Sequence, residues 1–201
     1  MQIDPNILIA WGGVSKMYLK NENIFFEENP ARFYFQILDG NVKMSNLNND
    51  GKEFIQGIFK SGESFGEPPL FLNENYPATA TALKESVVIK LSKDSFFKIL
   101  EAYPDIQFNF LKVFAKRIYS KASTNRDLIN NDPSHRIIAF LDSIKKENSE
   151  NEKRIKIPFT RQEIANFTGL RVETVIRTLL KMEKEQKVEI IDRKLYYCHE
   201  I

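Results

Sequence analysis

The chain has 201 residues, 42% of them hydrophobic and 28% charged, which is the composition of a globular protein with one large or two small domains. Its formal net charge is only +2, which excludes a polycation that binds nucleic acid over its whole surface. The single cysteine, Cys198, excludes an internal disulfide and an iron–sulfur cluster and fits a reducing compartment, so we expect a cytoplasmic protein.

The first half of the sequence is expected to be built mainly of β-strands. Residues 1–20 read as a short helical or irregular lead-in without a signal peptide, because no basic region precedes an apolar core. From about Ile24 to Leu91, short apolar runs alternate with turns such as Asp39-Gly40, which is a strong hairpin signal. Several short strands at regular intervals predict a β-sandwich or barrel, and no apolar run approaches the length of a membrane span.

Two helices are expected after the strands. A short one over residues 92–103 ends before Pro104, and a longer one runs from about Asp105 to Asn130. On the longer helix, apolar residues and one asparagine recur at alternating spacings of three and four, which is a heptad seam. The seam residues are Phe108, Leu111, Ala115, Ile118, Ala122, Asn125 and Ile129. The pattern favours a homodimer, although one amphipathic helix packed on the β-domain would give a similar stripe.

The segment from Thr160 to Lys184 is typical of a helix-turn-helix. It follows a helix that starts at Asp132-Pro133, a polar loop over residues 146–154 and a strand-like IKIPF. Thr160 and Glu163 have the spacing of a capping box, and Gly169 tolerates the positive φ of a sharp turn. Two ordinary amphipathic helices with a solvated charged face are the alternative interpretation.

The second helix of this pair is expected to begin near Arg171 and to carry the DNA-reading residues. It buries three apolar residues at helical spacing, which are Val175, Leu179 and Met182. Its solvent-facing residues are Glu173, Thr174, Arg177 and Lys181. Arg177 can donate a bidentate pair to guanine, and Glu173 can accept from cytosine N4. Two short strands around Asp192-Arg193-Lys194 then complete a winged helix.

The charge is divided unevenly between the two halves of the chain. Residues 1–104 contain 10 Lys/Arg against 13 Asp/Glu, a net −3, whereas residues 105–201 contain 19 against 14, a net +5. The basic half contains the helix-turn-helix, as an interface with nucleic acid requires.

The order of these parts resembles the CRP/FNR family of bacterial transcription regulators, from about Ile24 to Tyr197. The resemblance is carried by four motifs: Asp39-Gly40, Phe65-Gly66-Glu67, Thr160-Arg161-Gln162-Glu163-Ile164, and Glu173-Thr174-Val175 with Arg177. It implies an α+β fold with a β-roll sensor domain over 1–104, a dimerisation helix and hinge over 105–131, and a winged helix-turn-helix over 132–201. It also implies a homodimer that binds double-stranded promoter DNA and contacts RNA polymerase.

The resemblance assigns base reading to Glu173 and Arg177. It assigns phosphate contacts to Arg161, Gln162 and Thr174, and the first two also stand at a helix N-terminus, which attracts anions. A base-reading arginine of the family is replaced by Val172, for which the adjacent Arg171 is a candidate substitute.

The expected effector pocket departs further from the family. In members that bind cyclic nucleotides, a glutamate contacts the ribose and a following arginine neutralises the phosphate. Glu67 is present, but we place Pro77 at the position of the arginine, and proline offers neither charge nor N–H. The candidate pocket residues are Phe65, Gly66, Glu67, Pro77, Lys121, Ala122 and Ser123. Lys121-Ala122 stands where members of the family that bind cyclic AMP have a Thr-Ser pair that contacts the adenine. Lys121 can therefore supply positive charge only at the adenine end of the pocket.

We therefore expect an effector that is not cyclic AMP. Gly66 and Glu67 also have a structural explanation, in which the glycine makes a turn and the glutamate accepts from neighbouring N–H groups. Two other functions stay open: a regulator with an effector-independent sensor domain, and a true cyclic-nucleotide receptor with a non-standard phosphate contact.

Metal and haem chemistry are not expected. His135 lies past the long helix and His199 in the tail, where neither suits a haem ligand. A metal-dependent enzyme built on a β-roll needs clustered histidines, and residues 1–134 contain none. We therefore expect no metal, no certain cofactor and no enzymatic activity.

Overall fold

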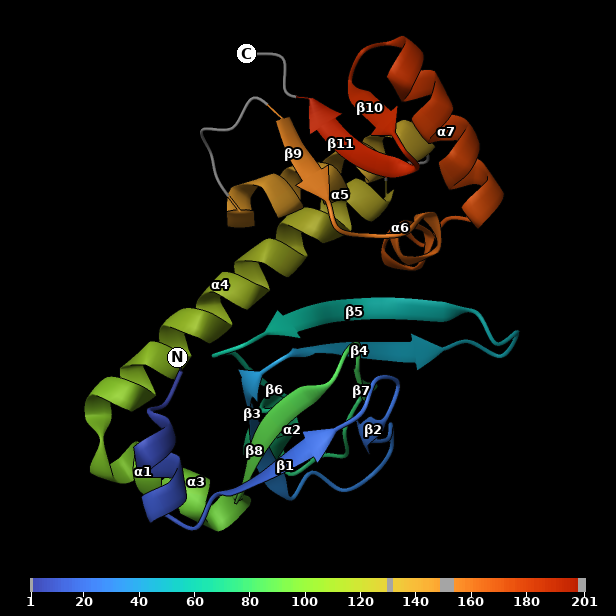
Figure 1. Cartoon of the computed structure of the whole chain (residues 1–201). Helices are drawn as coiled ribbons and strands as arrows, with labels where there is room; N and C mark the ends of the chain where they lie inside the picture. The colour runs from blue at the N-terminus through green and yellow to red at the C-terminus, as the bar shows by residue number, and fades with distance from the viewer. Residues whose placement is uncertain (1, 130–131, 149–153, 199–201) are drawn as a thin grey trace. The chain divides into compact units, whose positions relative to one another are not determined.

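The computed structural model describes residues 2–129, 132–148 and 154–198, and side chains at 2–119, 132–145 and 154–198. The chain divides into two compact units, Met1–Lys116 and Arg117–Ile201, with the boundary inside a long helix (Figure 1). In the described residues, no helix is both long enough and apolar enough to cross a lipid bilayer.

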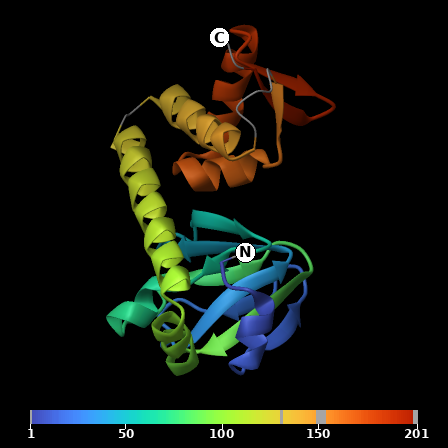
Figure 2. The same ribbon diagram turned by 90° about the vertical axis from the view of Figure 1, so that its left-hand side faces the viewer.

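The first unit is a β-roll with helices packed against it. Its strands are β1 (Val14–Tyr18), β2 (Asn23–Phe25), β3 (Phe33–Asp39), β4 (Asn41–Leu47), β5 (Glu53–Lys60), β6 (Ser64–Phe65), β7 (Thr79–Ala82) and β8 (Ser86–Ser92). Its helices are α1 (Pro5–Ala10), α2 (Pro68–Leu72), α3 (Lys93–Ala102) and the first part of α4 (Pro104–Ile129). Two antiparallel sheets, ordered β1-β8-β3-β6 and β2-β7-β4-β5, form the two layers of the roll (Figures 1 and 2). The expected strand-rich first domain and the two helices after it are confirmed.

The expected hairpin turn at Gly40 is present, and a second hairpin turn lies at Gly51. Gly40, between β3 and β4, has φ 112°, and a Cβ there would lie 2.1 Å from the Oγ of Ser86. Gly51, between β4 and β5, has φ 74°, and its N–H donates to the carbonyl of Asn48 at 2.9 Å. Backbone conformation alone favours glycine at position 51, whereas at position 40 space also excludes a side chain.

The expectation of an irregular lead-in is wrong for residues 14–18. Strand β1 pairs antiparallel with β8, from Val14 opposite Lys90 to Tyr18 opposite Ser86. Its first four residues are exposed and only Tyr18 is buried. The strand therefore lacks the alternation of buried and exposed residues by which a sequence reveals a strand, and it is defined by its pairing with a segment about 70 residues away.

Two apolar clusters stabilise the β-roll unit. One fills the interior between the sheets, and it includes Phe25, Phe35, Val42, Phe65, Tyr76, Ala78, Ala80 and Ala82. The other lies between the outer face of β3 and β8 and the helices α1, α3 and α4, and it includes Leu8, Tyr34, Ile89, Phe96, Ile99 and Phe110. Trp11, which follows α1, is partly buried against this second cluster.

The second unit is a winged helix-turn-helix. Its elements are α5 (Pro133–Asn148), β9 (Arg154–Ile157), α6 (Arg161–Thr168), α7 (Val172–Lys184), β10 (Val188–Ile191) and β11 (Lys194–Cys198). The strands form an antiparallel sheet ordered β10-β11-β9, and residues from all three helices and this sheet share one core. As expected, Asp132 caps α5: its Oδ1 accepts from the N–H of Ser134 at 3.0 Å. The start of the expected loop over 146–154 is helical instead, because α5 continues to Asn148, and residues 149–153 lie outside the described ones.

Candidate nucleic-acid interface

The first helix of the helix-turn-helix begins with the expected capping box. The N–H of Glu163 donates to the Oγ1 of Thr160 at 3.2 Å, and the N–H of Thr160 donates to the Oε2 of Glu163 at 2.7 Å. The box places a carboxylate of the chain itself at the N-terminus of α6. The box accounts for two of the four N–H groups that have no partner within the helix at this end, those of Thr160 and Glu163.

Gly169 makes the turn between α6 and α7. Its φ is 69°, and its N–H donates to the carbonyl of Ala165. A Cβ at Gly169 would meet nothing within 4 Å, so the left-handed backbone rather than lack of space requires glycine. Ala165 is fully buried in the core that α6 shares with α7.

Helix α7 has one buried face and one exposed face. Val175, Leu179 and Met182 lie in the core, as the periodicity predicted, and the half-buried Val172 packs against them. The opposite face lines a shallow groove that is formed by Glu173, Ile176, Arg177, Leu180, Lys181 and Lys184. These six residues follow spacings of three and four, so they project from one side of the helix. The exposed face is thus a continuous strip that can enter a DNA groove.

Sequence reasoning found part of this strip. Glu173, Arg177 and Lys181 are exposed as expected, whereas Thr174 is half-buried. Ile176, Leu180 and Lys184 were not among the expected DNA-contacting residues, although their spacing from Glu173 was a usable signal. Arg171 is exposed at the N-cap of α7, next to the half-buried Val172. An arginine is therefore available at the start of the helix to substitute for the base-reading arginine that Val172 replaces.

The two expected phosphate-contacting residues of α6 also have partners within the protein. Arg161 donates from Nη1 to the carbonyl of Arg193 at 3.3 Å, and Gln162 donates from Nε2 to Oδ1 of Asn166 at 2.9 Å. Burial lowers the pKa of the Arg161 guanidinium from its ordinary value, while the nearby Glu183 raises it. Arg161 thereby connects the start of α6 to the tip of the β-hairpin.

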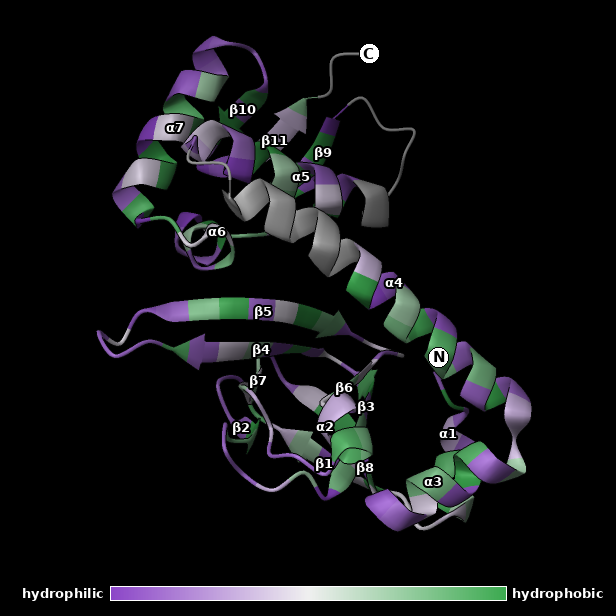
Figure 3. Ribbon diagram, turned by 180° about the vertical axis from the view of Figure 1, so that it is seen from behind, coloured by the Kyte–Doolittle hydropathy of each residue, from purple (hydrophilic) through white to green (hydrophobic). Residues whose placement is uncertain are grey.

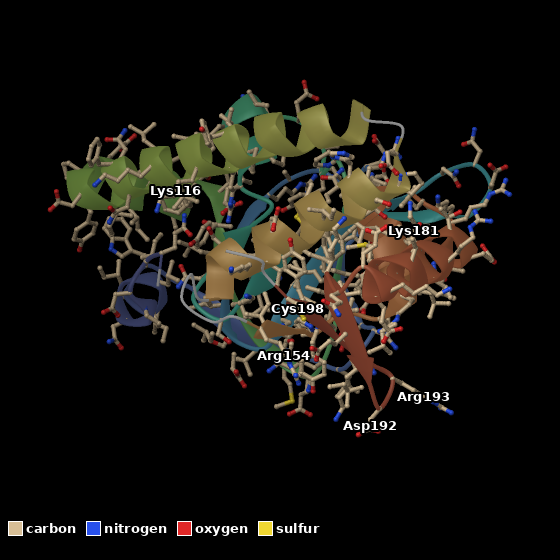
Figure 4. The ribbon with its side chains drawn as sticks, turned by 90° about the horizontal axis from the view of Figure 1, so that it is seen from above. Lys116, Arg154, Lys181, Asp192, Arg193 and Cys198 are labelled. Carbon is tan, nitrogen blue, oxygen red and sulfur yellow. The ribbon has the colours of Figure 1, made fainter. Side chains whose placement is uncertain are left out.

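The hairpin of β10 and β11 is the expected wing. Asp192 and Arg193 form its two-residue turn with φ of 48° and 63°, the left-handed conformation of a type I′ turn. Arg193 and Lys194 are exposed, and Figure 4 shows Arg193 pointing outward from the tip. An arginine held in a conformation that favours Asn or Gly adds positive charge at the end of the wing.

The wing is attached to the rest of its unit by side-chain contacts. Arg154 of β9 donates to Oε2 of Glu189 at 2.8 Å, and its guanidinium lies 4.4 Å from the ring centre of Tyr196. Tyr197 of β11 donates its hydroxyl to Oδ1 of Asp142 in α5 at 2.7 Å. Burial and then the Asp142 carboxylate raise the pKa of Tyr197, because both disfavour a second negative charge there.

Aromatic side chains fill the interior of the β-roll beside the expected pocket residues Phe65 and Gly66. Phe25 and Tyr76 stack with ring centres 3.8 Å apart, and Phe35 and Phe65 stack at 5.6 Å in the same cluster. Gly66 has φ 72°, and a Cβ there would lie only 3.0 Å from Phe25. The hydroxyl of Tyr76 donates to the carbonyl of Phe33 at 3.1 Å, and burial raises the pKa of Tyr76 to about 12.

Glu67 and Pro77 differ in exposure to solvent. The Glu67 side chain is fully buried and accepts a hydrogen bond from the hydroxyl of Ser64, a side-chain donor and not one of the N–H groups of the structural explanation. Pro77 is exposed, whereas Ala78 beside it is fully buried. Because side chains alternate across an extended segment, Ala78 rather than Pro77 faces the interior. Neither Pro77 nor Ala78 offers a positive charge to a phosphate.

The side chains of the remaining pocket residues, Lys121, Ala122 and Ser123, lie outside the described ones.

Helix α4 carries two different apolar faces. Phe110 is buried, and Ile106 and Phe114 pack against the β-roll unit. The described part of the expected seam is exposed instead, with Phe108 at 57%, Leu111 at 59% and Ile118 at 69%. Ala115 is exposed as well, and the side chains of Ala122, Asn125 and Ile129 lie outside the described residues. Figure 3 shows apolar residues recurring along the coloured part of this helix. Packing on the β-roll therefore does not account for the seam.

Comparison with known proteins identifies both units. A family model described as a cyclic nucleotide-binding domain matches residues 15–103, and one described as a Crp-like helix-turn-helix domain matches residues 135–199. The transcriptional activatory protein AadR of Rhodopseudomonas palustris is 28% identical over 178 residues, which cover 87% of this chain and 73% of that protein. The CRP-like cAMP-activated global transcriptional regulator of Mycobacterium tuberculosis is 26% identical over 163 residues, or 80% and 73% of the two chains.

A solved structure shows the same fold over nearly the whole chain. The c-di-GMP responsive global regulator CLP of Xanthomonas campestris matches with a TM-score of 0.81 and 19% identity, covering 98% of this chain and 100% of that one. One relative is named for cyclic AMP and this structure for c-di-GMP, so similarity alone does not assign a signal.

Proposed function

This chain belongs to the CRP/FNR family of DNA-binding transcription regulators, and on that premise we propose that it acts as a homodimer on double-stranded promoter DNA and responds to a signal other than cyclic AMP. Like its relatives it is a transcription regulator and not an enzyme. The single observation that carries the proposal is the exposed strip of α7, in which Glu173 and Arg177 stand one turn apart.

The chemistry of this strip supports sequence-specific binding in the major groove. An arginine presents two parallel donors that match the O6 and N7 of guanine, and a carboxylate can accept from the N4 of cytosine. Lys181 and the wing residue Arg193 are exposed in the same unit and suit phosphate contacts, and the exposed Arg171 is the candidate substitute for the base-reading arginine that Val172 replaces. We assign the same role to Arg161, Gln162 and Thr174, with Arg161 acting through the wing to which it is hydrogen-bonded.

The exposed seam of α4 supports the dimer. Phe108, Leu111 and Ile118 would be removed from water by a second copy of the same helix, and the exposed Ala115 permits a close approach. A dimer also places two recognition helices about one DNA turn apart, which matches an inverted-repeat operator. We extend the proposal to RNA polymerase as a partner, because the similar protein AadR is named an activatory protein.

The interior of the β-roll supports a signal other than cyclic AMP. Phe25, Phe35, Phe65 and Tyr76 occupy the space between the sheets, and the inward position next to them is Ala78. An arginine can donate two hydrogen bonds to the phosphate of a nucleotide. Losing both costs about 3–6 kcal/mol of binding free energy, which lowers the affinity a hundredfold or more. The buried Glu67 would also repel a phosphate that no cation neutralises. The same aromatic cluster also supports the first alternative, a regulator whose sensor domain needs no effector. The second alternative, a cyclic-nucleotide receptor with a non-standard phosphate contact, would depend on Lys121.

An operator selection tests the proposal. From a library of random duplexes, the full-length protein is expected to enrich an inverted repeat with half-sites about 10 base pairs apart, centre to centre. Enrichment is followed by sequencing, with and without candidate inducers and at several salt concentrations. No preferred sequence under any of these conditions would overturn the assignment.

A calorimetric titration tests the effector. Micromolar cyclic AMP and cyclic GMP are expected to give no saturable heat, because aromatic rings occupy the interior and none of the arginines whose side chains are described is buried there. The cAMP-activated regulator of Mycobacterium tuberculosis is the positive control in the same buffer. A clear isotherm with this protein would show that the aromatic cluster opens and that another group neutralises the phosphate.

A further inference from the structure

The exposed strip of α7 contains two apolar side chains that the folding of its unit does not explain. Ile176 is 45% exposed and Leu180 is 49% exposed, four residues apart on the same side of the helix. The core of the unit is completed by the opposite face, where Val175 and Leu179 are buried. They lie side by side on a face whose other residues are charged, so a ligand of this face can bury an apolar group against them.

Their neighbours restrict the kind of ligand. The groove that Ile176 and Leu180 line also contains Arg177, Lys181 and Lys184, with Glu173 as its single acidic residue. A positively charged border fits a polyanion better than an apolar protein surface. The ligand should therefore present apolar groups between phosphates, and in a DNA major groove the apolar group on the base edges is the C5-methyl of thymine.

We propose that Ile176 is a specificity-determining residue that contacts the C5-methyl of a thymine in each half-site. The inference rests on the proposed DNA-binding function and deepens it. Ile176 follows Glu173 by three residues and directly precedes Arg177, so the thymine lies at a base pair next to those that these two side chains read. It belongs to the N-terminal part of the recognition helix, which is the part that reaches base edges. Leu180 lies one helical turn later, so in the bound complex it would lie further from the base edges and nearer the rim of the DNA major groove.

The expected gain in binding free energy is small for each half-site, and it doubles when a dimer binds two half-sites. Burying one methyl group against an aliphatic side chain strengthens binding about fourfold, and two half-sites give about fifteenfold. Cytosine carries hydrogen in place of this methyl, so the contact discriminates thymine from cytosine without any hydrogen bond. Direct readout by Arg177 is unaffected by the methyl, which makes the two contributions separable.

A uridine scan isolates this contact. In the operator selected by the full-length protein, each thymine is replaced by deoxyuridine at symmetric positions of both half-sites, which removes only the methyl group. Fluorescence anisotropy should show about a fifteenfold loss at one position in each half-site for the wild type. Ile176→Ala should bind the unmodified operator about fifteenfold more weakly and be indifferent to uridine at that position, while Ile176→Val should remain sensitive.

Two controls separate the possible failures. Leu180→Ala changes the neighbouring exposed side chain and is expected to leave the uridine-sensitive position unchanged. If the wild type selects an operator but no thymine is sensitive, or if the sensitive thymine remains so in Ile176→Ala, the role of Ile176 is overturned and DNA binding stands. If no operator is selected at all, both proposals are overturned together.

Discussion

Replacing Ile118 by aspartate is expected to convert the dimer into a monomer and to weaken binding to a two-half-site operator by about 10²–10⁴-fold. Ile118 is 69% exposed, so its own unit loses little when it is replaced. Across a symmetric seam, however, two carboxylates would be buried near each other without partners, which disfavours association. A monomer then binds one half-site at a time and loses the high effective concentration of the second. Sedimentation velocity and fluorescence anisotropy measure the two effects.

Asn109→Asp is the matched control for this change. It adds the same single negative charge to the exposed surface of α4, half a turn away from Ile118 around the helix at about 100° per residue. This variant should remain a dimer with unchanged DNA affinity. An Ile118→Asp protein that still sediments as a dimer would place the interface elsewhere on the molecule.

Replacing Arg177 by alanine is expected to abolish the preference for one base pair in each half-site. The loss in binding to the selected operator should be about 1–3 kcal/mol per half-site, which amounts to about 2–6 kcal/mol for a dimer. The reason is that Arg177 lies exposed on the strip of α7 with no hydrogen-bonding role in the core, so its removal leaves a base edge without its donors. Competition binding against operators changed at each position measures the effect.

Lys181→Ala is the comparison that distinguishes base reading from charge. It removes one positive charge from the same strip, four residues further along α7. This change should weaken binding to all sequences alike and reduce the salt dependence by about one unit of slope per half-site. A uniform loss with Arg177→Ala as well would mean that Arg177 contacts the backbone and reads no base.

The features that the sequence predicted correctly depend on residues near one another in the chain. A helix cap such as that of Thr160 and Glu163, and a left-handed turn such as that at Gly169, require a few neighbouring residues and leave a local pattern. The same holds for the hairpin turn at Gly40 and for the buried stripe of α7. These local signals were sufficient to establish the order of elements and hence the family fold.

The features that were missed depend on residues far apart in the chain. Strand β1 is defined by its pairing with β8, and the aromatic cluster in the roll brings Phe25 against Tyr76. The burial of Ala78 beside the exposed Pro77 also depends on how that segment lies against the opposite sheet. Likewise, the hydrogen bond from Arg161 to the wing cannot be read from a pattern, since 32 residues separate the partners.

The position of Trp11 gives the protein a built-in spectroscopic probe of one unit. It is the single tryptophan of the chain, and it packs beside α1 against the apolar cluster of the β-roll unit. Its emission therefore reports the unfolding of this unit, whereas circular dichroism also follows the helices of the winged unit. Denaturation curves from the two signals coincide only when both units unfold as one cooperative system.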